Sequence, residues 1–247
     1  MYDEEEQTTE TETTEDTGPS NEPNDGDAVN EQDVDVKNEE VGNQFSHQRY
    51  LIIGNSGSGK TTLAWFIARR SPYCLFINPQ HANLPQFKET GVGNWKKDLV
   101  EQKHVQIKCP PGFDMEEFMT DWYEWCKADG KKIEEQITLA VDEISLFGVK
   151  GKLSSPPWSV TAISRMRALC NVILCTHSTY QIPNYYFNNM SYIIFMRTGQ
   201  AKAEQQYLDK WFTGAEQYRE ILGKKYYYII YDVNEDQYQP MNPLVLS

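Results

Sequence analysis

The segment Gly54-Asn-Ser-Gly-Ser-Gly-Lys60-Thr61 constrains the fold of this chain more than any other feature of the sequence. It has the pattern G-x-x-x-x-G-K-[ST], in which a glycine-rich loop joins a buried strand to a helix and surrounds phosphate oxygens with backbone N–H groups. The context is the required one, because the apolar run 50–53 comes before the loop and a segment with helical spacing of apolar residues, 61–70, follows it. The sequence therefore predicts a phosphate-binding loop in an α/β fold.

Each type of residue in this pattern has a physical role. Gly54, Gly57 and Gly59 allow backbone angles and a close approach that a side chain would block. Lys60 is expected to reach the β- and γ-phosphates, and the Thr61 hydroxyl to ligate Mg²⁺. The predicted cofactors are therefore ATP and Mg²⁺, and the residues expected to bind the nucleotide are Gly54, Asn55, Ser56, Gly57, Ser58, Gly59, Lys60, Thr61 and Thr62.

An acidic pair, Asp142-Glu143, directly follows the apolar run 137–141. A phosphate-binding loop needs a carboxylate for Mg²⁺ at the tip of a neighbouring strand, and Asp142 is expected to supply it. Glu143 is expected to act as the general base that polarises the attacking water. Asp232 and Glu235 are a weaker alternative pair, because their strand comes last in the chain.

Apolar runs alternate with helical patterns along the chain, which is typical of a parallel or mixed sheet covered on both faces. Strands are predicted at 50–53, 74–77, 105–107, 137–141, 171–176, 192–196 and 226–231, and helices at 61–70, 114–127, 160–169 and twice within 201–222. The predicted fold class is α/β, a P-loop NTPase core of the RecA-like (ASCE) type with a mostly parallel central sheet. The ATPase domain is expected to span 45–235, followed by a tail at 236–247.

Residues 1–44 differ sharply in composition from the rest of the chain. They hold sixteen acidic residues and one lysine, a net charge of −15, whereas the whole chain carries −13, so the remainder is near +2. Because this segment has almost no large apolar residue, we expect a disordered acidic arm. It is either a solubilising tail or an arm that shields a basic groove, and the charge of the remaining domain does not exclude a nucleic-acid partner.

The cysteines and the hydropathy pattern bear on the compartment. The five cysteines, Cys74, Cys109, Cys126, Cys170 and Cys175, form no C-x-x-C pair, and most lie in apolar stretches. Such thiols indicate a reducing compartment inside a cell. No signal peptide is recognised at the start, and no apolar run is long enough to span a membrane, so an integral membrane protein is not expected.

The order of motifs resembles that of the FtsK–HerA superfamily. Ser164-Arg-Met-Arg167 leads into a strand that ends in Thr176-His177-Ser178, much as an arginine-bearing helix in that family leads into a strand ending in Thr-Gln. Asn78-Pro79-Gln80 looks like the family's Asp-Pro-Lys turn, and the segment 191–197 follows in the family's order. The late aromatic strand and the short domain look like the viral branch, the genome-packaging ATPases. The resemblance covers about residues 48–235.

This resemblance implies a motor that hydrolyses ATP to move double-stranded DNA, without regard to sequence, into a preformed viral capsid. It implies a homo-oligomeric ring, a pentamer or hexamer, in which Arg165 or Arg167 completes the site of the next subunit, and capsid-vertex or virion membrane proteins as partners. His177 takes the place of the family's γ-phosphate sensor, although the usual residue there is Gln. Lys150 and Lys152 are candidates for contacts with DNA in the ring lumen. The expected location is the interior of the host cell at sites of virion assembly, with retention in the virion.

Two alternative functions remain open at this stage. One is another DNA-remodelling ATPase with the same core, such as a helicase or a conjugation-type motor. The other is a nucleotide-dependent assembly protein that has no DNA track. A nucleoside kinase is less favoured, because no arginine-rich lid follows the strand 171–176 and Glu143 suits hydrolysis better.

Overall fold

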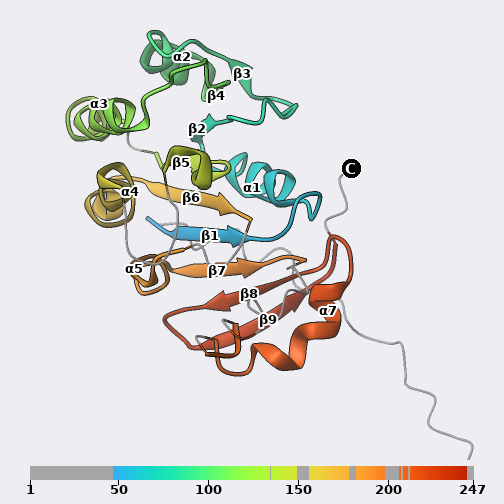
Figure 1. Ribbon diagram of the computed structural model, residues 1–247. Coiled ribbons are helices and arrows are strands. Elements are labelled where there is room, and N and C mark those ends of the chain that lie inside the picture. The colour runs from blue at the N-terminus through green and yellow to red at the C-terminus, as the bar shows by residue number, and fades with distance from the viewer. Residues whose placement is uncertain are drawn as a thin grey trace, which may run out of the picture. The chain divides into compact units, whose positions relative to one another are not determined.

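The predicted strands form one mixed sheet. The computed structural model describes residues 47–133, 135–148, 156–177, 182–197, 206, 208–210 and 212–243. Within these residues nine strands lie in the order β3-β4-β2-β5-β6-β1-β7-β8-β9, and Figure 1 shows them stacked from β3 at the top to β9 at the bottom. They are β1 (Arg49–Ile53), β2 (Tyr73–Ile77), β3 (Lys88–Glu89), β4 (His104–Ile107), β5 (Ile137–Val141), β6 (Asn171–Thr176), β7 (Tyr192–Phe195), β8 (Tyr228–Asp232) and β9 (Gln237–Met241).

The direction of the strands changes only at β8, which runs opposite to all the other strands of the sheet. The strands from β3 to β7 pair in parallel, whereas β8 runs antiparallel to β7 and β9 antiparallel to β8. The parallel strands therefore end together at what we call the carboxyl edge of the sheet, and begin together at its amino edge. Because β8 is reversed, its first residue lies at the carboxyl edge, where Ile229 pairs with Phe195 at the end of β7.

Helices cover both faces of the sheet, as predicted. They are α1 (Lys60–Ala68), α2 (Trp95–Gln102), α3 (Met115–Ala128), α4 (Pro157–Ser164), α5 (Asn184–Phe187) and α7 (Arg219–Gly223), with short 3₁₀ turns η2 (Gly130–Lys132), η3 (Ile144–Phe147), η4 (Arg165–Ala168) and η5 (Ala215–Tyr218). In β1, Leu51 and Ile53 pack with α2, α3, α4 and α5, while Tyr50 and Ile52 pack with α1 on the other face. This separation follows from the alternation of side chains along a strand.

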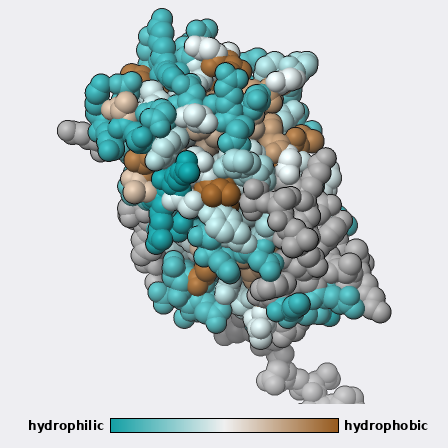
Figure 2. Space-filling view, turned by 60° about the vertical axis from the view of Figure 1, so that its left-hand side comes forward, coloured by the Kyte–Doolittle hydropathy of each residue, from teal (hydrophilic) through white to brown (hydrophobic). Residues whose placement is uncertain are grey.

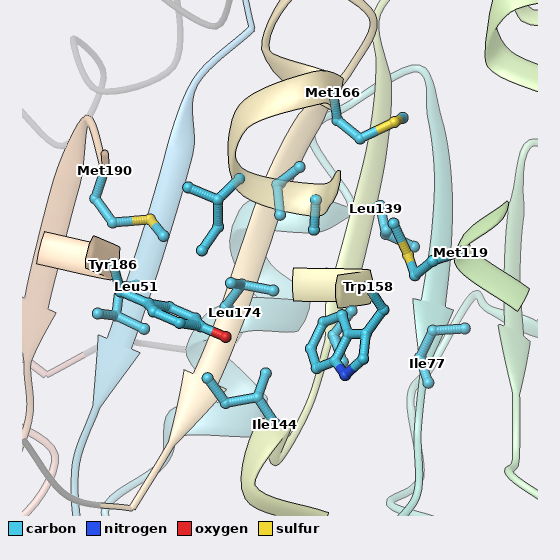
Figure 3. Packing of buried hydrophobic residues seen from close by; sticks show 14 of the residues in the cluster. Leu51, Ile77, Met119, Leu139, Ile144, Trp158, Met166, Leu174, Tyr186 and Met190 are labelled. Atoms are coloured by element: carbon cyan, nitrogen blue, oxygen red, sulfur yellow. The ribbon is translucent and has the colours of Figure 1, made fainter. Parts of the chain in front are cut away.

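The face with α2–α5 has an aromatic core. Asp114 caps α3 by accepting hydrogen bonds from the backbone N–H groups of Glu116 and Glu117. The helix buries one apolar face, made of Met115, Phe118, Met119, Trp122, Trp125 and Cys126. The ring centroid of Trp95 lies 5.1 Å from that of Trp122. Trp158 links α4 to η3 and α3, because its indole N–H donates to Phe147 O at 2.8 Å and its backbone N–H donates to Glu116 Oε2 at 2.7 Å. Figure 3 shows Trp158 and Tyr186 over the sheet, together with methionine side chains.

The surface on the side of α3, α4 and α5 is mostly polar. Figure 2 shows hydrophilic side chains over most of the described part of this view, with hydrophobic ones scattered among them. Among the helices that the structure describes, none is both long enough and apolar enough to cross a membrane.

Some predicted boundaries are wrong. The segment 236–247 is not simply a tail, because Gln237–Met241 is β9 and pairs with β8, so the domain continues beyond residue 235 and 226–231 is not the last strand. The elements α2, β3 and α5 were not predicted from the sequence. The predicted arm 1–44 lies outside the described residues, as do parts of the segment 201–222, in which η5 and α7 begin later than expected.

The two outermost strands are short or interrupted. At one side of the sheet β3 has only two residues, Lys88 and Glu89, and both are exposed. At the other side β9 contains Pro240, which pairs with Ile229 of β8 and has no backbone N–H to donate.

Candidate nucleotide-binding and hydrolysis site

The glycine-rich loop is fastened between two strands at the carboxyl edge. The backbone N–H of Gly54 donates to Thr176 O at 3.1 Å, and that of Asn55 donates to Arg197 O at 2.7 Å. These acceptors lie at the end of β6 and just after β7, the two neighbours of β1. Gly54 has no room for a side chain, because a Cβ would lie 2.7 Å from Ser58 Oγ and 2.8 Å from Met196 Cβ.

The loop has the backbone shape and the donors that a phosphate chain requires. Gly57 and Gly59 have φ angles of 73° and 98°, which favour glycine, and a Cβ on Gly57 would meet no atom within 4 Å. The first N–H groups of α1 have no acceptor within the helix, and the helix dipole favours an anion at this end. The buried hydroxyl of Ser58 has no hydrogen-bond partner among the described residues. The loop 54–59 and the start of α1 together form a cradle that fits phosphate groups.

Lys60 is held at the base of this cradle. Only 6% of its surface is exposed, and its ammonium group lies 3.2 Å from Asn55 O and 3.1 Å from Nδ1 of His177. Burial lowers the pKa of Lys60, while the neighbouring Cys175, Glu143 and Asp142 act to raise it. An ammonium group buried beside a glycine-rich anion cradle is suited to bind the phosphates of a nucleotide.

Thr61 and Asp142 form a pair of oxygen donors next to Lys60. The Thr61 hydroxyl donates to Asp142 Oδ2 at 2.8 Å. Burial raises the pKa of Asp142, opposed first by the hydrogen bond from Thr61 and then by the charge of Lys60. A hydroxyl and a carboxylate fit Mg²⁺, which binds few protein oxygens and completes its shell with phosphate oxygens and water. The described residues contain no cluster of three or more His, Cys, Asp or Glu side chains that could hold a metal ion.

Glu143 occupies a strained position. It is 3% exposed and has a φ of 52° and a ψ of 62°, a left-handed conformation that is unusual for a residue with a Cβ. Its carboxylate lies 2.6 Å from Nε2 of His177 and accepts a short hydrogen bond from the Ser145 hydroxyl. We assign the Nε2 proton to His177, because the Lys60 ammonium can donate only to an unprotonated Nδ1. Lys60, His177 and Glu143 thus form one hydrogen-bonded chain.

Other predicted residues lie elsewhere. Arg165 and Arg167 are exposed in η4, which precedes β6 and therefore lies at the amino edge, away from the loop of the same chain. Asp232 ends β8, also at the amino edge, and its carboxylate accepts from the backbone N–H groups of Asn234 and Glu235. The alternative prediction that Asp232 and Glu235 form the acidic pair of the site is therefore wrong. Lys150 and Lys152 lie outside the described residues.

Two side chains that were not predicted from the sequence, Ser145 and Cys175, contact the acidic pair. Ser145 donates to Glu143, and a hydroxyl two residues after an acidic residue is a signal that the sequence contained. The Cys175 thiol is fully buried, and the charge of Asp142 adds to the burial that raises its pKa. Because side chains alternate along β6, Cys175 lies on the face of the sheet that α1 covers. Together the groups of this site can hold a phosphate chain with a divalent cation and present a carboxylate to water.

The sheet order, the loop and the acidic strand tip define the fold of a P-loop NTPase. Comparison with solved structures confirms the predicted resemblance at the level of the fold. The genome packaging NTPase B204 from Sulfolobus turreted icosahedral virus 2, in complex with ATP-gammaS, matches with a TM-score of 0.62 and 19% identity over 80% of this chain and 98% of that chain. The same protein in complex with sulfate matches with a TM-score of 0.62 and 21% identity over 81% and 98%.

A third similar structure comes from a related virus. The DNA-packaging ATPase B204 from Sulfolobus turreted icosahedral virus matches with a TM-score of 0.59 and 20% identity, covering 81% of this chain and 98% of that chain. No protein-family model matches the chain, and no curated protein matches it. The similarity to the B204 structures establishes the fold.

Proposed function

We propose that this chain is an ATP-hydrolysing, DNA-translocating motor of the FtsK–HerA superfamily that packages a viral double-stranded DNA genome. The observation that carries this proposal is the hydrogen-bonded chain from Lys60 through His177 to Glu143, beside the Thr61–Asp142 pair. The likeness of the fold to a genome packaging NTPase solved with ATP-gammaS supports it.

The residues divide the work of hydrolysis. The loop N–H groups and Lys60 bind the phosphate chain, and Thr61 and Asp142 would hold Mg²⁺, which neutralises charge on the phosphates. Glu143 orients the attacking water and accepts its proton. Glu143 is contacted by His177 Nε2 and the Ser145 hydroxyl, and the remaining lone pairs of its carboxylate can accept the proton of the attacking water.

His177 connects the terminal phosphate to the base. In the structure the Lys60 ammonium donates to His177 Nδ1 at 3.1 Å. A phosphate oxygen is charged and accepts a stronger hydrogen bond than an imidazole nitrogen, so a bound triphosphate displaces His177 from Lys60. The imidazole then remains attached only to Glu143. In this way His177 acts as the sensor that couples the γ-phosphate to the catalytic carboxylate.

The remaining elements of the proposal concern assembly. Since Arg165 and Arg167 are exposed at the edge of the sheet opposite the loop, either can act only on the site of another subunit, as in a ring. We propose a homo-oligomeric ring, a pentamer or hexamer, around double-stranded DNA, working with capsid-vertex or virion membrane proteins at assembly sites inside the host cell. The free thiols in the described domain are consistent with a reducing compartment.

ATPase activity with and without double-stranded DNA, measured together with the native mass, tests this function. We expect hydrolysis that DNA of any sequence stimulates and a closed oligomer, with Lys60→Ala as the inactive control. Hydrolysis that DNA does not affect would favour an assembly protein without a DNA track. DNA-stimulated strand separation would favour a helicase, and a protein that hydrolyses no nucleotide at all would refute the proposal.

A further inference from the structure

Tyr226 lies beside the phosphate-binding loop with much of its ring exposed. A Cβ built on Gly59 would lie 3.2 Å from Cδ1 and 3.7 Å from Cε1 of Tyr226, so the edge of the ring contacts the glycine that precedes Lys60. Even so, 47% of Tyr226 is exposed, which makes it one of the few exposed large hydrophobic residues in the described part of the chain. The contact with Gly59 therefore uses only part of the ring.

The backbone of Tyr226 is unfavourable for its residue type. Its φ is 69°, in the left-handed region that bulky residues rarely adopt. Residues held in this way occur at ligand-binding sites, where the surrounding structure fixes them. The Nζ atom of Lys225 lies over one face of the ring at 4.7 Å from the centroid. Since 47% of Tyr226 is still exposed, the ring retains surface that a ligand can cover.

The sheet order shows which part of a nucleotide would reach Tyr226. Asp142 and Glu143 follow β5 and His177 follows β6, and both strands lie on one side of β1. The γ-phosphate must be near these groups, so the nucleoside extends from the loop toward the other side of β1. There lie β7 and β8, and the reversed direction of β8 places Tyr226, two residues before it, at the carboxyl edge (Figure 1).

We propose that Tyr226 holds the base of the bound nucleotide by stacking its exposed ring face on it. This inference rests on the proposed nucleotide-binding function and adds a site for the nucleoside to the site for the phosphates. Because every base has a π-face, stacking of this kind tolerates different bases. The site is therefore expected to bind adenine and guanine nucleotides with affinities within about tenfold of each other.

Binding of ADP and of inorganic tripolyphosphate, both with Mg²⁺, to the full chain tests the proposal without any need for turnover. Stacking on one base is worth about 1–3 kcal/mol by alanine substitution, so Tyr226→Ala should weaken ADP binding by about 5- to 140-fold. Tripolyphosphate has no base, and its affinity should change less than about twofold. Tyr226→Phe should bind both ligands like the unaltered chain.

Two further variants separate stacking from effects on folding. Tyr226→Asn removes the ring and suits the left-handed backbone, so it should weaken ADP binding while the thermal midpoint stays the same or rises. Tyr227→Ala is the matched control, since Tyr227 is the adjacent tyrosine and contacts Lys224 rather than the loop. It should leave both affinities unchanged.

The outcomes distinguish this proposal from the proposed function. Equal weakening of ADP and tripolyphosphate would show that Tyr226 only shapes the loop, and unchanged ADP binding would show that it does not contact the base; either result overturns the stacking proposal. If the unaltered chain binds neither ADP nor tripolyphosphate, nucleotide binding is refuted, and the stacking proposal with it. If Tyr226→Ala weakens ADP binding but not tripolyphosphate binding, and DNA does not stimulate hydrolysis by the unaltered chain, the stacking proposal is supported and only the DNA-translocating function is refuted.

Discussion

Replacement of Glu143 by glutamine tests the assignment of the base most directly. The amide has nearly the volume of the carboxylate and fits the same 3%-exposed position, but it cannot accept the proton of the attacking water. General-base catalysis contributes about 10²–10⁴-fold, so turnover in Glu143→Gln should fall by roughly 10²-fold or more. A 10²-fold loss corresponds to about 2.7 kcal/mol in the activation barrier.

Binding should respond in the opposite direction. Glu143 lies in the field of Lys60 and close to where the terminal phosphate binds, so removal of its charge removes a repulsion from the phosphate. ATP affinity should therefore be retained or improved. Stability should change by no more than about 1 kcal/mol, because the amide oxygen can still accept one of the two hydrogen bonds that the carboxylate receives from His177 and Ser145.

The assay is steady-state ATP hydrolysis together with nucleotide affinity and the thermal midpoint of each variant. Ser145→Ala is the matched control, since it removes a hydrogen bond to the carboxylate but leaves the base in place, and it should lose less than about tenfold in turnover. If Glu143→Gln keeps turnover within about threefold, the group is not the base. If the variant loses ATP binding instead, Glu143 is a metal ligand and the assignment is wrong.

Three other predictions follow from the site and the core. Lys60→Ala should abolish hydrolysis and greatly weaken triphosphate binding in an equilibrium binding assay, because the main cation for the phosphates is gone; unchanged turnover would remove the basis of the proposal. For one of the two arginines, which we expect to be Arg167, a mixture of the Arg→Ala protein with Lys60→Ala protein should hydrolyse ATP faster than either protein alone. Full activity of both Arg165→Ala and Arg167→Ala on their own would contradict a site shared between subunits. Burial raises the pKa of Cys109 to about 12, above its usual value of 9.0, so a thiol reagent at pH 8 should react slowly with the native chain and rapidly in urea. The stability that this half-buried thiol contributes should be complete below about pH 9 and be lost as the pH rises toward 12. Rapid labelling of the native Cys109 at pH 8 would contradict the raised pKa.

The sequence predicted the centre of the sheet well, because the signals there are local. The strands β1, β5 and β6 are fully buried and read as continuous apolar runs, and each ends in a residue of the site or next to one. The carboxyl ends of parallel strands meet at one edge, so Lys60, Asp142 and His177 could be brought together from their positions in the chain alone.

The periphery could not be predicted in the same way. The helix α2 buries only Trp95 and Leu99 of its eight residues, too few to produce a clear helical period. The strand β9 exposes most of its side chains and contains a proline, so its pattern resembles a loop. Both elements form because of contacts with the rest of the fold, which local sequence does not record.

The same limit applies to the site. The position of Tyr226 depends on the reversal of β8, and no pattern near residue 226 indicates that this residue lies against Gly59. The hydrogen bond from Lys60 to His177 likewise joins residues 117 positions apart. Sequence reasoning could name His177 as a candidate but could not show that it bridges the lysine and the base.

The ends of the sheet determine how copies of the chain can meet. Unpaired outer strands invite the strands of another molecule to add to them, which leads to fibres and aggregates. Here one outer strand, β3, is two residues long and charged, and the other, β9, contains Pro240, which has no backbone N–H to donate. Neighbouring copies are therefore not expected to join by continuing the sheet from one to the next. The interface of the proposed ring should consist of side chains from helices and loops, which can slide and re-form during each cycle while the sheet inside each subunit stays intact.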